Sequence, residues 1–161
     1  MGTHPVRPAT EADLELLPAV ELAADAVFRT VGVDLPPDTA SVPELRAAEF
    51  VLVAGTPPVG FASVERVDGL AYLAQLSVHP DAARRGVGSA LLAAVVQRCT
   101  REGFGALTLT TFADVAWNGP FYRRRGFADL PDPGPELLRH VEELSWLAEF
   151  GRRETLVLPL R

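Results

Sequence analysis

One stretch in the middle of the chain has the pattern of a strand followed by a glycine-containing loop and a helix. Residues 73–78 are mostly apolar, and residues 87–101 carry apolar side chains at helical spacing. Gly86 and Gly88 lie where the loop enters the helix, and a backbone without side chains lets a ligand approach closely. The first N–H groups of a helix have no partner within it and attract anions, above all phosphate. The sequence therefore predicts an anion-binding loop at this position.

The loop does not match two common phosphate-binding motifs. A dinucleotide-binding motif would need a third glycine where the chain has Leu91, and a Walker loop would need a lysine, which the chain lacks. Arg84 and Arg85 add positive charge beside the glycines. The alternative interpretation is a plain connection between strand and helix in which the two arginines are incidental.

The rest of the chain alternates between strand and helix patterns. Strand patterns cover residues 6–8, 50–54, 59–67, 70–78, 107–111 and 155–160, and helix patterns cover 11–27, 43–48, 87–101, 120–125 and 136–150. Thr10 and Gly126 suit the N-terminal and C-terminal caps of two of these helices. A turn signal at Asp68-Gly69 predicts that the strands around it form an antiparallel meander. This order indicates an α/β (α+β) fold with a mixed sheet, and the length of 161 residues predicts a single domain over 1–161.

Composition argues against several other classes of protein. The net charge of −6 argues against general binding to nucleic acid or to an anionic membrane. Cys99 is the only cysteine, which rules out internal disulfides and a cysteine-based zinc site, and we predict no metal. No apolar run reaches the roughly 18 residues of a membrane span, and residues 1–10 lack the pattern of a secretory signal. We therefore expect a cytoplasmic protein.

A second group of informative residues lies at 117–127, with the sequence Trp-Asn-Gly-Pro-Phe-Tyr-Arg-Arg-Arg-Gly-Phe. Pro120 is compatible with the first turn of a helix. Asn118 then has a structural interpretation as the N-cap of that helix, and Tyr122 has one as a half-buried aromatic residue. The arginines at 123–125 have one as a solvated helix face near its C-terminus.

Three segments together resemble the GCN5-related N-acetyltransferase family. They are Val78-His79-Pro80, Arg84-Arg85-Gly86-Val87-Gly88-Ser89-Ala90-Leu91-Leu92 and Phe121-Tyr122-Arg123-Arg124-Arg125-Gly126-Phe127. The last two follow one another in the order that the family has, and the resemblance covers most of the chain. It implies a single-domain fold with a mixed sheet of about six to seven strands flanked by helices. In such a fold a splayed pair of strands holds acetyl-CoA.

The resemblance also implies roles for individual residues. The pantetheine arm of acetyl-CoA would pair with the backbone of Leu76, Ser77 and Val78, and its pyrophosphate would lie on the loop formed by Arg84, Arg85, Gly86, Val87, Gly88 and Ser89. Tyr122 matches the family tyrosine that donates a proton to the departing thiolate, and Asn118 would contact the cofactor. The amine would attack the thioester directly, without a covalent acyl-enzyme.

The general base is less clearly marked in the sequence. Many relatives place a glutamate on the strand that here carries Gln75, whose side chain cannot take a proton. Glu65 on the preceding strand is the first candidate, and an exposed strand carboxylate is its alternative interpretation. Weaker candidates are Glu21, Asp25 and His79. Phe28 and Gln75 are expected to line the acceptor site, where Asp25, Asp34 and Asp38 could attract a cationic amine.

The function implied by the resemblance is acetyl-CoA-dependent acetylation of a primary amine, most simply that of a small molecule. A protein N-terminus or lysine remains an alternative acceptor within this class. From another class, a non-catalytic acyl-CoA-binding sensor is favoured slightly by Gln75 and disfavoured by Tyr122. A tRNA-acetylating toxin is disfavoured by the charge of −6. The sequence leaves open the acceptor, the acyl chain and the oligomeric state, including a homodimer.

Overall fold

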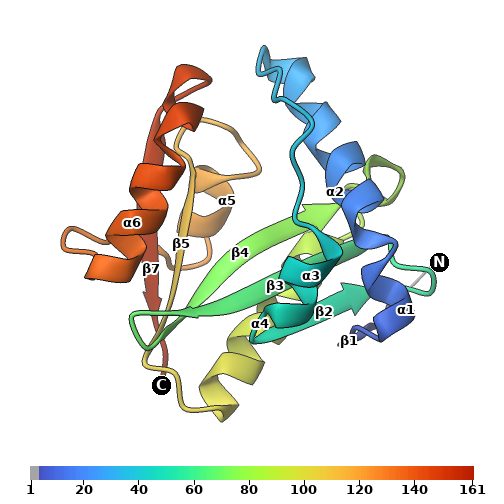
Figure 1. The fold of residues 1–161 in the computed structure, drawn as a ribbon, viewed down its shortest axis with the longest axis horizontal. Coiled ribbons are helices and arrows are strands. Elements are labelled where there is room, and N and C mark those ends of the chain that lie inside the picture. The colour runs from blue at the N-terminus through green and yellow to red at the C-terminus, as the bar shows by residue number, and fades with distance from the viewer. Residues whose placement is uncertain (1–3) are drawn as a thin grey trace. The chain divides into compact units, whose positions relative to one another are not determined.

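The computed structural model describes residues 4–161 as an α/β fold built from seven strands and the helices that flank them (Figure 1). Residues 1–3, which belong to the segment tested for a secretory signal, lie outside the described residues. The strands are β1 (Val6–Pro8), β2 (Phe50–Ala54), β3 (Gly60–Val67), β4 (Leu70–Val78), β5 (Ala106–Phe112), β6 (Ala128–Asp129) and β7 (Arg153–Pro159). The helices are α1 (Glu11–Leu14), α2 (Leu17–Ala26), α3 (Val42–Ala47), α4 (Val87–Arg101), α5 (Gly119–Arg123) and α6 (Pro135–Glu143), with 3₁₀ turns η1 (Val27–Val31), η2 (Pro80–Ala82) and η3 (Ser145–Glu149).

The strands form one mixed sheet in the order β1-β2-β3-β4-β5-β7-β6, which confirms the predicted fold class. β1, β2 and β3 pair antiparallel, as do β5 with β7 and β7 with β6. β4 and β5 pair in parallel, with Ala71 and Tyr72 opposite Leu107 and Thr108. The chain divides into two compact units, and β4 contributes to both. The first contains the chain up to Glu65 together with Leu73–Arg98, and the second contains Arg66–Tyr72 and Cys99–Arg161.

The first unit buries an apolar core between its sheet and three short helices. Leu14, Leu17, Val20 and Leu45 come from α1, α2 and α3, and they pack with Val51, Val53 and Phe61 of β2 and β3. Side chains alternate between the two faces of a strand, so Gly60 presents the opposite face of β3. A Cβ atom added there would come within 3.2 Å of Val87 and Leu91, which shows how closely α4 packs on that face. Helices therefore cover both faces of the sheet in this unit.

The helix predicted over residues 11–27 is interrupted in the structure. α1 ends at Leu14, and α2 begins at Leu17 with Pro18 in its first turn. A proline has no N–H to donate and clashes with the preceding turn, so it starts a helix more readily than it continues one. The predicted cap is confirmed, because Thr10 accepts a hydrogen bond from the Asp13 N–H in a reciprocal capping box.

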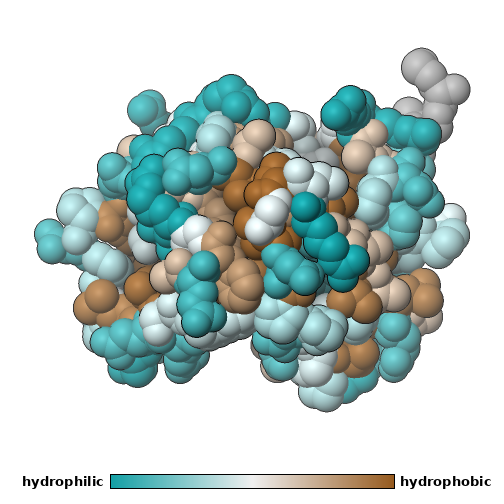
Figure 2. Space-filling view, turned by 90° about the horizontal axis from the view of Figure 1, so that it is seen from above, coloured by the Kyte–Doolittle hydropathy of each residue, from teal (hydrophilic) through white to brown (hydrophobic). Residues whose placement is uncertain are grey.

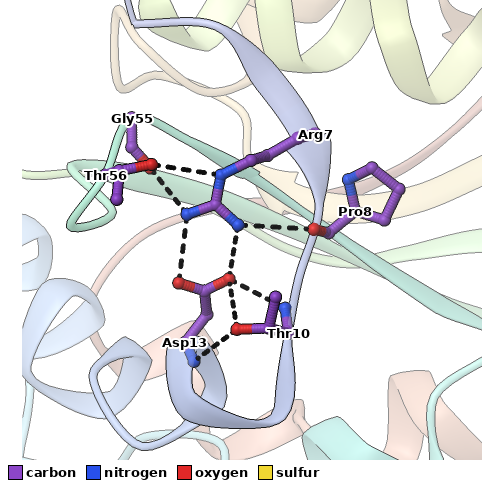
Figure 3. A network of polar contacts seen from close by, with 6 residues as sticks. All are labelled: Arg7, Pro8, Thr10, Asp13, Gly55 and Thr56. Atoms are coloured by element: carbon purple, nitrogen blue, oxygen red, sulfur yellow. Dashed lines mark hydrogen bonds and ion pairs between the residues drawn. The ribbon is translucent and has the colours of Figure 1, made fainter.

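Arg7 and Asp13 join the first strand to the first helix and to the turn after β2 (Figure 3). Arg7 donates from Nη1 to Asp13 Oδ2 at 2.6 Å and from Nη2 to Asp13 Oδ1 at 3.1 Å. The same guanidinium donates to the Gly55 carbonyl at 3.1 Å and to Thr56 Oγ1 at 3.3 Å. The Arg7 hydrogen bond is the main reason why the pKa of Asp13 falls to about 2.

In the second unit, Asp68 connects the β3–β4 turn to α6. Its two carboxylate oxygens accept hydrogen bonds from the N–H groups of Glu136 at 2.9 Å and Leu137 at 3.0 Å, while the Glu136 side chain accepts one from the Asp68 N–H. The carboxylate thus satisfies the first N–H groups of the helix from a distant part of the chain. A Cβ atom at Gly134 would come within 2.5 Å of this carboxylate, so the site needs a glycine.

The C-terminal end of α5 agrees with the prediction, whereas that of α6 does not. The predicted C-terminal cap of α5 is confirmed, because Gly126 has a φ of 97° and its N–H donates to the Arg123 carbonyl at 3.1 Å. The predicted helix over 136–150 is wrong as a single element. α6 ends at Glu143, and Leu144, with a φ of −96° and a ψ of 6°, joins it to the separate turn η3.

The surface mixes hydrophilic and apolar residues, as the face drawn in Figure 2 shows. The large apolar side chains exposed to solvent are Leu16, Leu22, Val31, Trp117, Leu138 and Trp146. Within residues 4–161, none of the helices combines the length and the apolar character needed to span a membrane.

The Arg7–Asp13 pair predicts a stability effect that depends on pH. At pH 7 we expect Asp13→Asn to lower the free energy of unfolding by about 2 kcal/mol, because a buried charge-assisted hydrogen-bond pair is lost. The folded-state pKa lies below the ordinary 3.8, so this stabilisation is complete above about pH 4 and is lost as the pH falls towards 2. Urea denaturation between pH 7 and pH 2.5 measures both.

The matched control is Asp34→Asn, which removes an exposed ion pair with Arg29. Its effect should stay below about 1 kcal/mol at every pH. An Asp13→Asn variant as stable as the wild type at pH 7 would contradict the prediction.

Candidate active site

The predicted anion-binding loop lies between β4 and α4 in the first unit. It starts with the turn η2, in which the N–H groups of Ala82 and Ala83 donate to the carbonyls of His79 and Pro80. His79 Nδ1 accepts a hydrogen bond from the Asp81 N–H at 3.1 Å. The imidazole therefore caps this turn, which supports the structural interpretation of His79.

The backbone of the loop takes an uncommon conformation just before the helix. Arg84 has a φ of 63° and Gly86 a φ of 75°, and a non-glycine residue in this region is strained. The first hydrogen bond of the helix runs from the Ala90 N–H to the Gly86 carbonyl at 2.9 Å. The N–H groups of Gly86 and Val87 precede that bond and carry the positive end of the helix dipole.

The loop is open to an incoming anion. Arg84, Arg85 and Gly86 are exposed, and a Cβ atom added at Gly86 would meet no heavy atom within 4 Å. Backbone N–H groups, the helix dipole and two arginines are the features of an anion-binding helix start. The structure thus brings the predicted loop residues together at the end of β4.

The end of β4 leads straight into this loop. Ser77 is buried, and its Oγ accepts a hydrogen bond from Gln75 Nε2 at 2.8 Å. The His79 N–H donates to the Val59 carbonyl at 2.7 Å, which keeps the strand end attached to β3. Leu76 and Val78, which alternate with Ser77 along the strand, are half-buried. Gln75, predicted to contact the acceptor, thus holds a side chain of the predicted cofactor strand.

Tyr122 lies in the second unit, on α5, and is buried, with 7% of its surface exposed. Its ring meets those of Phe121 and Phe127 edge-on, at centroid distances of 5.2 and 5.5 Å. Burial raises the pKa of its hydroxyl above the usual range. The hydroxyl is therefore protonated at neutral pH, the state that a proton donor requires.

Asn118 occupies the N-cap position of α5 but does not cap it with its side chain. Its carbonyl accepts the Tyr122 N–H at 3.1 Å, so the two predicted site residues are linked through the backbone of one helical turn. The half-buried amide of Asn118 is thus not used by the helix start.

The carboxylates that could act as a base lie in the first unit. Glu65 is half-buried at the end of β3 and shares its face with Phe61. Glu21 on α2 is 6% exposed, and its Oε1 accepts the Ala40 N–H at 3.1 Å. Burial raises the pKa of Glu21 to about 7 and that of Asp25, one turn further along, to about 6.

The sequence was least informative about which of these carboxylates is the best candidate for the general base. Glu21 and Asp25 follow the fully buried Leu17 at intervals of four residues, which places all three on one face of α2. That spacing was the available signal that the two carboxylates point away from solvent. Phe28, predicted to line the acceptor site, is buried in the turn η1 after α2.

Within residues 4–161, no three His, Cys, Asp or Glu side chains are grouped in a way that could hold a metal ion.

Comparison with known proteins identifies the family. The sequence profile described as the Acetyltransferase (GNAT) family matches residues 23–127, which include the loop at Gly86, the strand end at Ser77 and the helix of Tyr122. The chain belongs to the GNAT acetyltransferase family. The resemblance predicted from the sequence is thereby confirmed.

Solved structures of GNAT proteins share the fold over nearly the whole chain. The PaiA N-acetyltransferase from Thermoplasma acidophilum, in complex with coenzyme A, has a TM-score of 0.73 at 15% identity, covering 98% of this chain and 99% of that one. A GCN5-related N-acetyltransferase from Rhodopseudomonas palustris has a TM-score of 0.71 at 24% identity, covering 99% and 98%. The ribosomal-protein-S18-alanine N-acetyltransferase from Escherichia coli has a TM-score of 0.68 at 21% identity, covering 98% and 94%. At these identities the similarity shows the fold.

The raised pKa of Glu21 predicts a pH dependence of stability opposite in sign to that of Asp13. Between its ordinary value of 4.5 and its folded value of about 7, the folded state holds a proton that the unfolded state has released. Stability therefore falls as the pH rises through this window. Glu21→Gln can still accept the Ala40 N–H but has no titrating carboxyl. We therefore expect its free energy of unfolding to decrease less than that of the wild type as the pH rises, by on the order of 2 kcal/mol.

Thermal or urea unfolding of both proteins at pH 5, 6, 7 and 8 measures the effect. Glu15→Gln is the control, because Glu15 is an exposed glutamate at the end of α1. Parallel curves for the wild type and Glu21→Gln would show that the buried carboxyl does not gain a proton on folding.

Proposed function

We propose that the chain works as one N-acetyltransferase domain that moves the acetyl group of acetyl-CoA to the primary amine of a small molecule. The observation that supports this most is the loop of Arg84 and Gly86, which ends β4 and presents the N–H groups of α4. Membership of the GNAT family makes the pyrophosphate of a CoA thioester the natural anion for this loop. The acetyl group and the acceptor class are part of this proposal.

The loop holds the pyrophosphate through backbone N–H groups from Arg84 to Ser89, with Arg84 and Arg85 adding positive charge at the rim. The pantetheine arm pairs with the backbone of Leu76, Ser77 and Val78. Ser77 is held by the Gln75 amide at 2.8 Å, which stiffens the strand along which the thioester lies. Asn118 contacts the cofactor through the side chain that its own helix does not use.

The reaction is a direct transfer. The amine nitrogen attacks the thioester carbonyl carbon and gives a tetrahedral intermediate. Backbone N–H groups of β4 near Leu76 stabilise the negatively charged oxygen of this intermediate. The carbon–sulfur bond then breaks, and the departing thiolate takes the proton of the Tyr122 hydroxyl. The nitrogen loses its extra proton to water as it becomes an amide, and the tyrosinate takes a proton back from water. Thiols are fair leaving groups with a pKa of about 8.5, so the tyrosine speeds a step that is already accessible.

The base must remove a proton from the amine, because alkyl amines are protonated at neutral pH. Glu65 remains the first candidate from the sequence. The carboxyl pair of Glu21 and Asp25 is a second source, supported by pKa values of about 7 and about 6, close to the pH at which a base works best. Of these two, Asp25 is the more exposed and has the better access to an amine.

The direct test is release of free thiol from acetyl-CoA while a panel of amines is added one at a time. The panel contains polyamines, aminoglycosides, amino acids, arylamines and a short peptide. Release that depends on one class of small amine supports the proposal and names the class. Release with the peptide alone would assign the protein-acetylating alternative, and micromolar binding of acetyl-CoA without any release would indicate the sensor.

Gly86 provides a test of the cofactor loop. The methyl group of Gly86→Ala would contact no protein atom within 4 Å. It would lie where we propose that the pyrophosphate binds. We expect acetyl-CoA affinity to fall by about 10-fold or more, because a close backbone approach to the phosphate is blocked. Isothermal titration calorimetry measures the affinity.

Gly103→Ala is the matched control for this change. Gly103 follows the other end of α4, has a φ of 84° and likewise has nothing within 4 Å of an added Cβ. Both variants should lose about 1 kcal/mol of stability from the positive φ. Equal acetyl-CoA affinities in the two variants would argue against the cofactor loop.

Tyr122→Phe tests the proton donor. The change removes one hydroxyl from a buried ring, and we expect kcat to fall by about 100-fold while the dissociation constant of acetyl-CoA changes by less than about 2-fold. Steady-state thiol release and calorimetry measure the two quantities. An unchanged kcat would assign Tyr122 a packing role only.

A further inference from the structure

Arg153, which sequence reasoning did not single out, lies at the start of β7 in the second unit. It is half-buried and pairs across the sheet with Phe112 of β5, over whose ring its guanidinium lies at 4.7 Å from the centroid. Its Nη2 donates to Thr110 Oγ1 at 3.2 Å. Thr110 is two residues before Phe112 and therefore presents its side chain on the same face of β5.

Two other arginines of this unit, Arg123 and Arg152, have carboxylate partners, whereas Arg153 has none among the described residues. Arg123 on α5 contacts Asp129 at 2.5 Å and Glu154 at 2.7 Å, and the adjacent Arg152 contacts Asp114 at 3.0 Å. Among residues 4–161, no carboxylate lies within 4.0 Å of the Arg153 guanidinium. Burial lowers its pKa, and the Tyr72 hydroxyl offsets that effect only in part.

A guanidinium in this position has unused binding capacity. It carries five N–H donors, and the structure records one of them bonded to protein, the bond to Thr110. Burying a charge without a counter-charge costs free energy. Its planar fork fits a carboxylate with two parallel hydrogen bonds, which is the strongest way of recovering that cost.

Other polar groups meet at the same place. The Tyr72 hydroxyl lies 3.2 Å from Thr110 Oγ1, and the His140 ring of α6 packs edge-on against Tyr72 at 5.2 Å between centroids. The carboxylate of Asp68 holds the start of α6, and with it this helix, in place. Arg153 therefore lies near the hydroxyl groups of Thr110 and Tyr72, on a face of the second unit next to a helix whose start is fixed by hydrogen bonds.

We propose that Arg153, together with the Thr110 hydroxyl, binds a carboxylate group of the acceptor, so that the acceptor is a small amino acid rather than a simple amine. This inference rests on the proposed acetyl transfer. The carboxylate lies against the guanidinium fork, and the Thr110 hydroxyl keeps that fork oriented. Arg153 lies beyond the last residue of the family match, residue 127.

The first experiment compares matched pairs of ligands on the wild-type protein. Each L-amino acid is tested against its own amide, which keeps the amine and the side chain and removes only the carboxylate charge. We expect kcat/KM for thiol release to be about 10- to 100-fold higher for the acid, the range for a hydrogen bond to a charged group. Equal values for acid and amide would overturn the carboxylate site while leaving acetyl transfer intact.

The second experiment uses variants at two neighbouring positions. Arg153→Gln should raise KM for the amino acid about 10-fold or more and leave KM for its amide and the affinity for acetyl-CoA unchanged. Arg153→Lys keeps the charge without the fork and should lie in between. Arg152→Gln is the matched control, because Arg152 is exposed and paired with Asp114, and it should behave like the wild type.

Two results with these variants would overturn the inference. A similar rise in KM for acid and amide in Arg153→Gln would mean a purely structural role, and weaker acetyl-CoA binding would mean that the guanidinium serves a phosphate of the cofactor. Thermal unfolding checks that the variants fold. If Arg153→Gln does not fold, two other results decide whether Arg153 binds a carboxylate. They are the comparison of each amino acid with its amide on the wild type, and the KM of Arg153→Lys.

A binding measurement separates this inference from the proposed function. N-acetyl-L-amino acids and their amides are titrated by calorimetry into the wild-type protein saturated with CoA, which requires no turnover. Tighter binding of the acids supports the carboxylate site even if no amine in the panel releases thiol. Equal binding overturns the site even if acetyl transfer is observed.

Discussion

The parallel pairing of β4 with β5 is the constraint on which the candidate site depends. Two parallel strands that are neighbours in a sheet cannot be joined by a tight turn, so the chain needs a long crossover, usually a helix. Here the crossover is α4, Val87–Arg101. It follows that the start of a helix lies directly after the end of β4, and that the N–H groups of this helix are offered at a strand end. The positive φ angles of Arg84 and Gly86 make the turn from one element to the other.

Three buried or half-buried ionisable side chains have different partners in this molecule. Asp13 is paired with Arg7 and its pKa falls, whereas Glu21 has only a backbone N–H and its pKa rises because burial dominates. Arg153 is half-buried and has no counter-charge among the described residues. A fold retains unpaired buried charge at a cost, and such groups are concentrated at functional sites. This contrast is the reason for assigning a base role near α2 and a ligand role to Arg153.

Much of the fold and part of the site could be predicted from residues alone. The meander, the loop at Gly86 and the cap at Gly126 were predictable because glycine and turn signals act over a few residues. The division of the first helix at Pro18 is equally local, yet the apolar spacing on both sides of it concealed the break. The end of α6 at Glu143 could not be predicted, because no glycine or proline marks it and the apolar spacing continues through Leu144 and Leu147.

The sequence by itself determined the family, the order of the elements and the positions of Gly86 and Tyr122, to which we assign the cofactor loop and the proton donor. These features depend on spacing along the chain, which a sequence records directly. Tertiary structure alone decided the burial of Tyr122, the raised pKa values of Glu21 and Asp25, and the absence of a carboxylate beside Arg153 among the described residues. The physical reason is that desolvation and charge pairing depend on which distant segments pack together, and nothing in the local spacing of Arg153 distinguishes it from the adjacent, paired Arg152.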